Sequence, residues 1–341
     1  MTPSILFVHN HRTTFVEIDL NLLRELCPTE ELFLRRTDLS PVEILRRVRR
    51  ATLVFGWFAS WHTFLPMLFA RLLRKPSVLV VGGYDIACIP AIGYGHQRPG
   101  VRRIISQATM KSASVLMTNS FYSQREAERN TGVPASHIAV VYHGVPDPFG
   151  EIATENRRPL VLTVGNVDMT NLYRKGLDPF VRSASLLGGL QFQVIGAWKD
   201  RAADRLRSLA GPNVALTGWL SREALVGRYR KASVYVQASQ HEGFGMSVAE
   251  AMLGGCIPVV TRAGALPEVV GETGVYVRGE DPNDLADGIR RAASAGHEAR
   301  RACRERILTR FPLENRRVGL RGVVTAAMSG TWRGRMARQT Q

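Results

Sequence analysis

The chain has 341 residues, of which 45% are hydrophobic and 22% are charged, the proportions of a soluble globular protein. This length exceeds what one ordinary hydrophobic core accommodates, which excludes a single small domain and favours two. The formal net charge is +16, and the basic excess lies in residues 1–150 (17 basic, 11 acidic) and 290–341 (13 and 3), whereas residues 151–289 hold 15 of each.

The first half of the chain alternates short apolar runs with amphipathic stretches, which is typical of an α/β sheet. The N-terminus runs directly into a strand pattern without a basic n-region, so we expect no signal peptide. A helix is predicted over residues 15–26, where apolar side chains recur at helical spacing. Strands are predicted at Ile5–His9, Leu53–Phe58, Ser77–Val81, Val115–Thr118 and Ile138–Tyr142.

Residues 51–73 form the one stretch that is nearly apolar and nearly long enough to span a membrane. Gly56, His62 and Pro66 interrupt it. We therefore interpret it as a strand followed by a packed helix over residues 63–73.

The second half repeats the α/β pattern after a polar, turn-rich segment at residues 147–158 that is interpreted as a linker. We predict an N-terminal domain of residues 1–150, a C-terminal domain of residues 159–310, and a C-terminal segment of residues 311–341 that ends in a frayed basic tail. The strands predicted in the C-terminal domain are Pro159–Gly165, Phe192–Gly196, Val214–Thr217, Val234–Val236 and Ile257–Val260.

Two glutamates, Glu242 and Glu250, bracket the segment E-G-F-G-M-S-V-A-E between a predicted strand and a predicted helix. The glycines let the backbone approach a ligand closely, and the following helix presents free N–H groups that suit a phosphate. Eight mostly helical residues span roughly 12 Å, which suits one carboxylate at each carbohydrate end of a sugar nucleotide. The plain alternative is two solvated glutamates around an ordinary loop.

The residues that follow, 251–270, read as a helix, a glycine stop, a short apolar strand and a further helix start. With this continuation the chain resembles family 4 of the retaining glycosyltransferases, whose hallmark is an E-x7-E element headed by EGFG. The resemblance implies the GT-B fold, with two doubly wound Rossmann-like domains facing across a cleft. It also implies an N-terminal domain on the acceptor side, a C-terminal domain that binds the donor, and a final segment that returns to the first domain.

The resemblance assigns roles to both glutamates. Glu242 is expected to contact and orient the transferred sugar, and Glu250 to hold the ribose diol. Backbone amides of the intervening turn are expected to meet the sugar and the phosphate. The residues of this turn are Gly243, Phe244, Gly245, Met246 and Ser247.

A second element, Val164-Gly165-Asn166 followed by Lys175-Gly176, resembles the place where the family grips the donor diphosphate with a basic pair. The family commonly has arginine where this chain has Asn166. Lys175, with Arg174 as a candidate substitute for that arginine, is expected to stabilise the departing diphosphate. The alternative is a solvated loop lysine.

The first domain departs from the family pattern, because Asp85 stands where many relatives carry a histidine. Asp85 is our candidate for contacting the sugar or the acceptor hydroxyl, and the alternative is a turn aspartate after the glycine pair. His143 is interpreted as structural. The first loop, residues 9–15, lacks the family's glycine pair, and either its polar side chains replace that function or they form a satisfied loop cluster.

The resemblance implies a retaining glycosyltransferase that moves a sugar from a nucleotide-diphosphate sugar to a hydroxyl acceptor, without a protein nucleophile. No D-x-D motif occurs in the chain, so we expect no metal and no other cofactor. A sugar-nucleotide epimerase or hydrolase, and a non-catalytic module that binds the sugar nucleotide, stay open as alternatives.

The charge and the cysteines bear on partners and location. No nucleic-acid partner is expected, because the chain has no recognisable binding motif. The basic excess fits an anionic membrane surface or a merely solvated face. We expect a cytoplasmic protein, with attachment to the inner face of a membrane left open.

Four widely spaced cysteines are interpreted as free thiols of a reducing compartment: Cys27, Cys88, Cys256 and Cys303.

Overall fold

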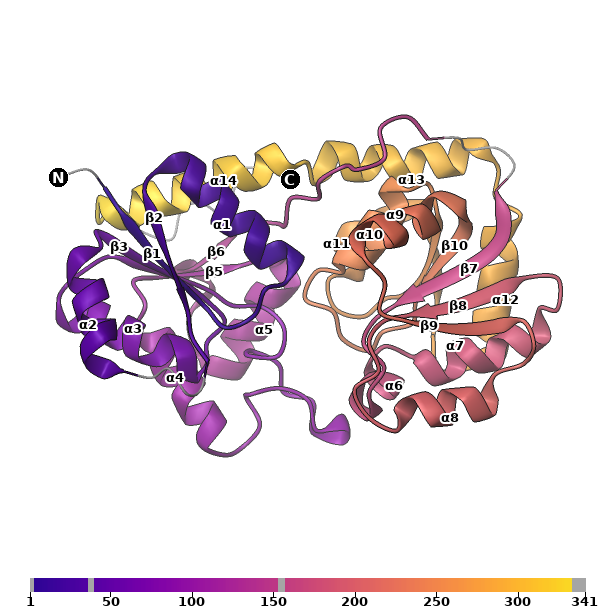
Figure 1. The fold of residues 1–341 in the computed structure, drawn as a ribbon, viewed down its shortest axis with the longest axis horizontal. Coiled ribbons are helices and arrows are strands. Elements are labelled where there is room, and N and C mark those ends of the chain that lie inside the picture. The colour runs from indigo at the N-terminus through magenta and orange to yellow at the C-terminus, as the bar shows by residue number, and fades with distance from the viewer. Residues whose placement is uncertain (1–2, 36–39, 153–156, 333–341) are drawn as a thin grey trace. The chain divides into compact units, whose positions relative to one another are not determined.

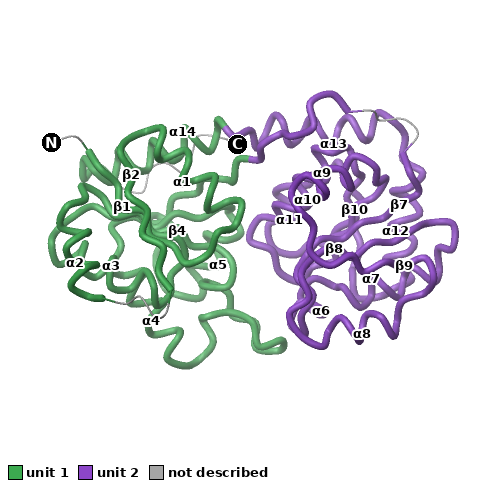
Figure 2. The backbone as a smooth tube through the Cα atoms, in the orientation of Figure 1, with its two compact units in different colours: residues 1–144, 314–341 green, residues 145–313 purple. Residues whose placement is uncertain are grey.

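The computed structural model describes residues 3–35, 40–152 and 157–332. The chain divides into two compact units (Figure 2): unit 1 is Met1–Gly144 with Glu314–Gln341, and unit 2 is Val145–Leu313. Most of the predicted basic tail, residues 333–341, and part of the predicted linker, residues 153–156, lie outside the described residues.

Unit 1 contains a six-stranded parallel sheet in the order β2-β1-β3-β4-β5-β6. Four of its strands are buried along their whole length, as near-continuous runs of Val, Ile, Leu and Phe predict for a parallel sheet covered on both faces. The strands are β1 (Ile5–His9), β2 (Thr29–Phe33), β3 (Leu53–Trp57), β4 (Ser77–Val80), β5 (Val115–Thr118) and β6 (Ile138–Val140).

Helices cover both faces of this sheet, with α1 and α14 on one face and α2, α3 and α4 on the other (Figure 1). The core between α2–α4 and the sheet is built from aliphatic side chains such as Leu6, Val54 and Leu79. The helices are α1 (Thr14–Leu26), α2 (Pro41–Arg50), α3 (Trp61–Leu72), α4 (Val101–Ser112), α5 (Phe121–Thr131) and α14 (Leu313–Met328), with short 3-10 turns at Pro90–Ile92 and Ala135–His137.

Unit 2 repeats the design with a six-stranded parallel sheet in the order β12-β11-β10-β7-β8-β9. Its strands are β7 (Arg158–Val164), β8 (Gln191–Ile195), β9 (Val214–Gly218), β10 (Ala232–Gln237), β11 (Ile257–Thr261) and β12 (Val275–Val277). Its helices are α6 (Met169–Arg174), α7 (Leu177–Ser183), α8 (Ala202–Leu209), α9 (Arg222–Lys231), α10 (Met246–Leu253), α11 (Leu266–Val270), α12 (Pro282–Ala293) and α13 (His297–Arg310), with 3-10 turns at Ala184–Leu186 and Gly271–Thr273.

The strand order creates a topological switch point in each unit. In unit 2 the chain leaves β7 toward β8 on one side and later returns to add β10 on the other side. The loops that follow β7 and β10 therefore diverge at the carboxyl edge of the sheet, where open α/β sheets bind their ligands. In unit 1 the equivalent point lies between β1 and β3.

The predicted class, two doubly wound α/β domains, is confirmed, and the predicted strands lie within two residues of the observed ones. Two edge strands, β2 and β12, were not predicted. The structure ends unit 1 at Gly144 rather than at residue 150, because Phe149 packs in unit 2, where Arg230 lies 5.7 Å from its ring. The C-terminal return begins at Glu314 rather than at residue 311, since the Phe311 ring contacts Phe244 of unit 2 at 5.3 Å.

Residues 51–73 form β3 and α3, as predicted. Nowhere in the described part of the chain is a helix both long enough and apolar enough to cross a bilayer.

Candidate functional site

Lys175 and Glu242 meet at the switch point of unit 2. Lys175 caps the C-terminus of α6 in the loop after β7, and Glu242 lies in the loop after β10. The Lys175 Nζ stands 2.9 Å from the Glu242 Oε1, and the two side chains are only 14% and 12% exposed. The same Oε1 accepts hydrogen bonds from Gln237 Nε2 at 2.8 Å and Ser239 Oγ at 3.1 Å. Lys175 and Glu242, which were predicted from separate motifs, thus belong to one buried, hydrogen-bonded cluster.

The electrostatics of this cluster favour a negatively charged Glu242 next to a positively charged Lys175. Burial alone would raise the pKa of Glu242, but Lys175 and Arg174 outweigh it and lower the pKa to about 2. Burial lowers the pKa of Lys175 from its ordinary value, and the Glu242 carboxylate offsets part of that effect. Glu242 is therefore a carboxylate throughout the physiological range, poised to accept hydrogen bonds.

Two glycines make this close arrangement feasible. A Cβ on Gly165 would lie 2.5 Å from Cδ of Lys175, so the absence of a side chain leaves room for the lysine stem. Gly264 adopts φ +62, and a Cβ there would lie 2.2 Å from the carbonyl oxygen of Glu242. Both glycines that the sequence places at strand ends therefore shape the backbone around the charged pair.

Arg174 belongs to the same cluster. Its guanidinium lies 3.6 Å from the Glu242 Oε1, donates to the backbone oxygen of His241 at 3.1 Å, and makes two bonds to Asn171 Oδ1 at 3.0 and 2.7 Å. Asn171 in turn donates to the backbone oxygen of Asn166, whose own side chain is exposed. Arg174, which directly precedes Lys175 in the sequence, thus supplies a second cation next to the Glu242 carboxylate.

Glu250 lies on the first turns of α10, with its side chain 13% exposed and its Oε1 3.3 Å from Arg222 Nη1. Burial raises the pKa of Glu250, and Arg222 offsets part of the rise. The helix begins after Gly245, which adopts φ +99, and Met246 and Ser247 form its first turn. Gly243 precedes this turn in the loop after β10. The ring of Phe244 is buried against Phe311, so only its backbone is available to a ligand.

These elements coincide with a known family. Residues 158–295 match the family model described as glycosyl transferases group 1. This part of the chain is a glycosyltransferase group 1 domain. The D-inositol 3-phosphate glycosyltransferase of Acidothermus cellulolyticus is 30% identical over 230 residues, which cover 59% of this chain and 50% of that protein. The corresponding enzyme of Corynebacterium jeikeium is 44% identical over 69 residues, 20% of this chain and 16% of its own length. The chain thus spans half or less of these curated relatives.

Solved structures extend the likeness over both units. Anabaena HepE in complex with UDP and glucose gives a TM-score of 0.77 at 14% identity, covering 96% of this chain and all of HepE. Sucrose-phosphate synthase of Thermosynechococcus elongatus gives 0.75 at 18% identity, covering 97% and 100%. At such identities the likeness shows the fold, which is the predicted GT-B class.

Asp85 belongs to unit 1, outside the group 1 domain. Its side chain is 1% exposed and accepts the backbone N–H of Ala59 at 3.0 Å and of Gly82 at 3.1 Å. Burial raises its pKa to about 6, against the lowering effect of these two amides. Because each oxygen already holds a backbone N–H, the geometry favours the alternative interpretation, a turn aspartate.

The other unit 1 residues singled out by sequence are also tied into the fold. His143 is buried, and its Nε2 lies 3.0 Å from Asn119 Nδ2. Burial lowers the pKa of His143 well below its ordinary value. Arg12 of the first loop donates to Glu31 at 2.7 Å, and His9 lies 3.0 Å from the same carboxylate. His9 and Arg12 thus form the satisfied cluster of one interpretation, whereas Asn10 Oδ1 and Thr13 Oγ1 of the same loop are buried without a hydrogen-bond partner among the described residues.

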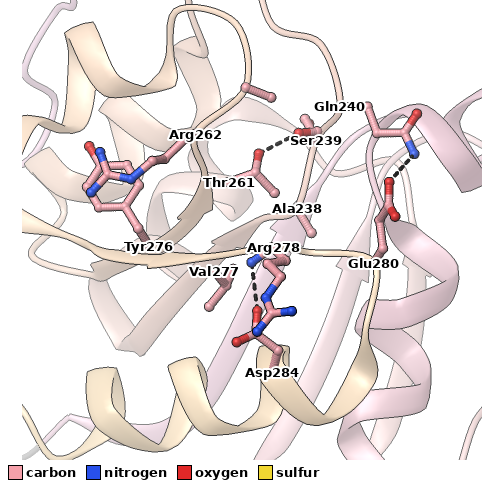
Figure 3. A pocket seen from close by; sticks show the side chains of 11 residues that line it. Ala238, Ser239, Gln240, Thr261, Arg262, Tyr276, Val277, Arg278, Glu280 and Asp284 are labelled. Atoms are coloured by element: carbon pink, nitrogen blue, oxygen red, sulfur yellow. Dashed lines mark hydrogen bonds between the residues drawn. The ribbon is translucent and has the colours of Figure 1, made fainter.

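The group 1 domain also contains a pocket of about 800 Å³ that sequence reasoning missed (Figure 3). It lies at the carboxyl ends of β10, β11 and β12, and Ser239 connects it to Glu242. Arg262 stacks on the Tyr276 ring at 4.1 Å, and Asp284 accepts the backbone N–H of Arg278 at 2.6 Å. The pocket therefore presents guanidinium, carboxylate and hydroxyl groups together, and the predicted strand ends were its only sequence signal.

Proposed function

We propose that the chain is a retaining glycosyltransferase that moves a sugar from a nucleotide-diphosphate sugar to a hydroxyl acceptor, which is a glycan, a lipid-linked saccharide or a small molecule. The observation that carries the proposal is the buried cluster of Lys175, Arg174 and Glu242 at the switch point of a group 1 glycosyltransferase domain. Two findings support the donor class. Anabaena HepE has been solved with UDP-glucose, and the curated relatives are named as glycosyltransferases.

In the proposed reaction, Lys175 and Arg174 face the diphosphate as it departs with the electrons of the glycosidic bond. Fixed cations in a largely buried site stabilise that developing charge without reorganising at the moment of reaction. Glu242, already ionised and held by Gln237 and Ser239, accepts hydrogen bonds from the sugar and fixes its orientation. Retention follows from attack on the same face that the diphosphate leaves, with the phosphate taking the acceptor's proton.

A thermal-shift panel of UDP, GDP, ADP, CMP and dTDP with their sugars tests the donor site. One nucleoside diphosphate is expected to raise the melting temperature, and Lys175→Met is expected to abolish the rise. Lys231→Met, which removes an exposed lysine of the same unit, should leave it intact. NMR of the product then reads the anomeric configuration, and an inverted linkage or release of free sugar alone would contradict the proposal.

Glu250 gives a prediction for pH. A carboxylate that holds the ribose diol must be ionised, and its pKa is raised above the ordinary value of 4.5. The donor KM should therefore rise as the pH falls toward that raised pKa, whereas Glu242, with a pKa of about 2, adds no dependence in this range. Glu250→Gln should raise the donor KM by about tenfold or more at neutral pH and remove the acid dependence. A KM unchanged by Glu250→Gln would show that the ribose is held elsewhere.

We also propose that the reaction needs no metal ion. The chain lacks a D-x-D motif, and within the described ranges no three His, Cys, Asp or Glu side chains come together as ligands. Lys175 and Arg174 supply the positive charge instead. Activity should be unchanged after dialysis against EDTA. If activity fell and Mg²⁺ or Mn²⁺ restored it, this part of the proposal would fail.

A membrane-facing surface is proposed for unit 1. A hollow of about 510 Å³ is lined by four cations, Arg71, Arg74, Lys75 and Lys111, and none of the four pairs with a carboxylate in the part of the chain that the structure describes. Leu72 beside them is 68% exposed. This combination suits anionic headgroups.

Flotation with anionic vesicles tests this surface. We expect binding that salt weakens and that Arg74→Ser with Lys111→Ser reduces. The matched control is Arg49→Ser with Arg50→Ser, which removes the same charge from exposed positions of α2. Equal flotation with neutral and anionic vesicles would reject the idea.

A further inference from the structure

Unit 1 has a cavity of about 650 Å³ at its own switch point, lined by the loops that follow β1, β3 and β4. Aromatic rings of Phe58, Trp61 and Tyr84 form much of its wall. Tyr84 is braced edge-on by Tyr94, with ring centroids 4.9 Å apart. The cavity is therefore preformed and largely apolar, the kind of site that takes the apolar part of a small molecule.

Two histidines in this wall, His62 and His96, add no charge to it at neutral pH. Burial lowers the pKa of His62 to about 4 and also lowers the pKa of His96, so both rings are neutral at pH 7. Asp85 points its oxygens at the backbone amides of Ala59 and Gly82. An apolar chain or ring in the cavity would consequently meet rings rather than exposed ions.

Two polar atoms of the lining residues are nevertheless buried and unpaired. Asn10 Oδ1 and His62 Nδ1 have no hydrogen-bond partner among the residues that the structure describes. An orphaned buried acceptor costs stability, but both atoms are closed off from solvent, so a ligand hydroxyl reaches them only if these side chains turn. A ligand therefore meets the apolar walls and the rim of the cavity first.

The rim of the cavity is amphipathic. Val101 begins α4, lines the cavity and is 69% exposed, and Ile105, about one turn on, lines the cavity as well. Between them Arg102 Nη1 donates to the Tyr84 hydroxyl at 3.4 Å. Apolar side chains and a cation side by side at the mouth fit a molecule that carries an apolar part next to an anionic group.

Backbone strain marks the same wall. Phe58 adopts φ +65, a left-handed conformation that a bulky residue adopts only under constraint. Its N–H donates to Val80 at 2.8 Å, and its carbonyl accepts the Thr63 hydroxyl at 2.6 Å. The surrounding hydrogen bonds therefore hold this ring in the wall against its local preference, as happens at functional sites.

We propose that this cavity binds an amphipathic acceptor, with an alkyl chain or ring between Phe58, Trp61 and Tyr84 and an anionic group such as phosphate at Arg102. The inference rests on the proposed glycosyltransferase function and narrows its acceptor class. An amphipathic acceptor would differ from the acceptor of the D-inositol 3-phosphate glycosyltransferases that the chain resembles in sequence, because inositol phosphate has no apolar part to pack against these rings.

Displacement of 1-anilinonaphthalene-8-sulfonate, an apolar ring system with one anionic group, tests the proposal on the full chain without any donor. We expect single-site fluorescence enhancement that octyl phosphate reverses and that inorganic phosphate and D-inositol 3-phosphate do not. Glu242→Gln should bind the dye as the wild type does. If the dye did not bind in this way, the proposed donor site would still stand. If nucleotide binding failed instead, the dye result would still stand.

Two variants localise the site. Val101→Asp should weaken octyl phosphate by about tenfold or more, because it removes an apolar contact and adds a like charge. The matched control is Val42→Asp, because Val42 is 74% exposed in the first turn of α2. This control variant should bind octyl phosphate as the wild type does. Arg102→Gln should weaken octyl phosphate and leave octanol unchanged. Equal effects of the two valine variants, or equal competition by octyl phosphate and D-inositol 3-phosphate, would overturn the proposal.

Discussion

Glu242→Gln is expected to lower the rate of sugar transfer by at least about a hundredfold to a thousandfold at saturating donor. The amide keeps the shape of the side chain and still accepts from Gln237 or Ser239, but it removes the negative charge that Lys175 and Arg174 share. Both cations then lose their fixed counter-ion, and the sugar loses a charged acceptor. The measurement is kcat with saturating donor, with KM determined in parallel.

The fold must survive for this result to be interpretable. Removing one partner of a buried pair can cost about 3–5 kcal/mol, so the melting temperature and circular dichroism of the variant have to be recorded. Glu223→Gln, an exposed glutamate on α9 of the same unit, is the matched control and should match the wild type in both rate and stability. Near-wild-type turnover of a folded Glu242→Gln protein would remove Glu242 from the proposed mechanism.

The pH dependence of this pair has a definite sign. The pKa of Glu242 is depressed in the folded protein to about 2, so its contribution to stability is present above the ordinary pKa of 4.5 and is lost only as the pH falls through about 2. Any loss of activity as the pH falls from neutrality must therefore arise from other groups, among which Glu250 and Asp85 both have a raised pKa.

Most strands that sequence reasoning found are well buried, although β9, a half-exposed edge strand, was found as well. β1, β3, β4 and β5 are buried along their length, and their unbroken apolar runs were visible in the sequence. β2 reads Thr-Glu-Glu-Leu-Phe and is mostly half exposed at a sheet edge, and β12 has three residues. A strand as polar as β2 or as short as β12 is defined by pairing with a neighbour more than by its own composition, so its local pattern did not reveal it.

The site shows the same division between local and non-local information. Lys175 and Glu242 stand in local motifs, and the structure places their side chains together. Their partners did not stand out, because Gln237 and Ser239 reach Glu242 through the geometry of the β10 loop, and Arg222 reaches Glu250 across 28 positions of sequence. Asp85 is the opposite case. Its motif suggested a chemical role, but its carboxylate accepts backbone N–H groups of Ala59 and Gly82. Residue type and spacing identify candidates, and the hydrogen-bond partners decide between them.

The C-terminal helix supplies the largest expected effect on stability. Arg316 of α14 forms a two-pronged ion pair with Asp19 of α1, with Nε–Oδ1 and Nη2–Oδ2 distances of 2.8 and 2.6 Å, and both side chains are at most 1% exposed. Trp57 Nε1 donates to the same carboxylate at 3.1 Å. The pair joins residues 297 positions apart within unit 1 and ties the returning helix to its first helix.

Arg316→Met should therefore destabilise unit 1 by about 3–5 kcal/mol, because it leaves Asp19 buried with a charge and no cation. The neighbour Arg317 provides the control: it pairs with Glu25 at 2.9 Å and Glu314 at 2.7 Å but is 32% exposed, so Arg317→Met should cost less than about 1 kcal/mol. Urea unfolding measures both, with the two units allowed separate transitions. The double change of Arg316→Met with Asp19→Asn should recover part of the loss, since no unpaired charge then remains in the interior. If the two arginine variants were equally stable, α14 would be held by its apolar face alone and the buried pair would be dispensable.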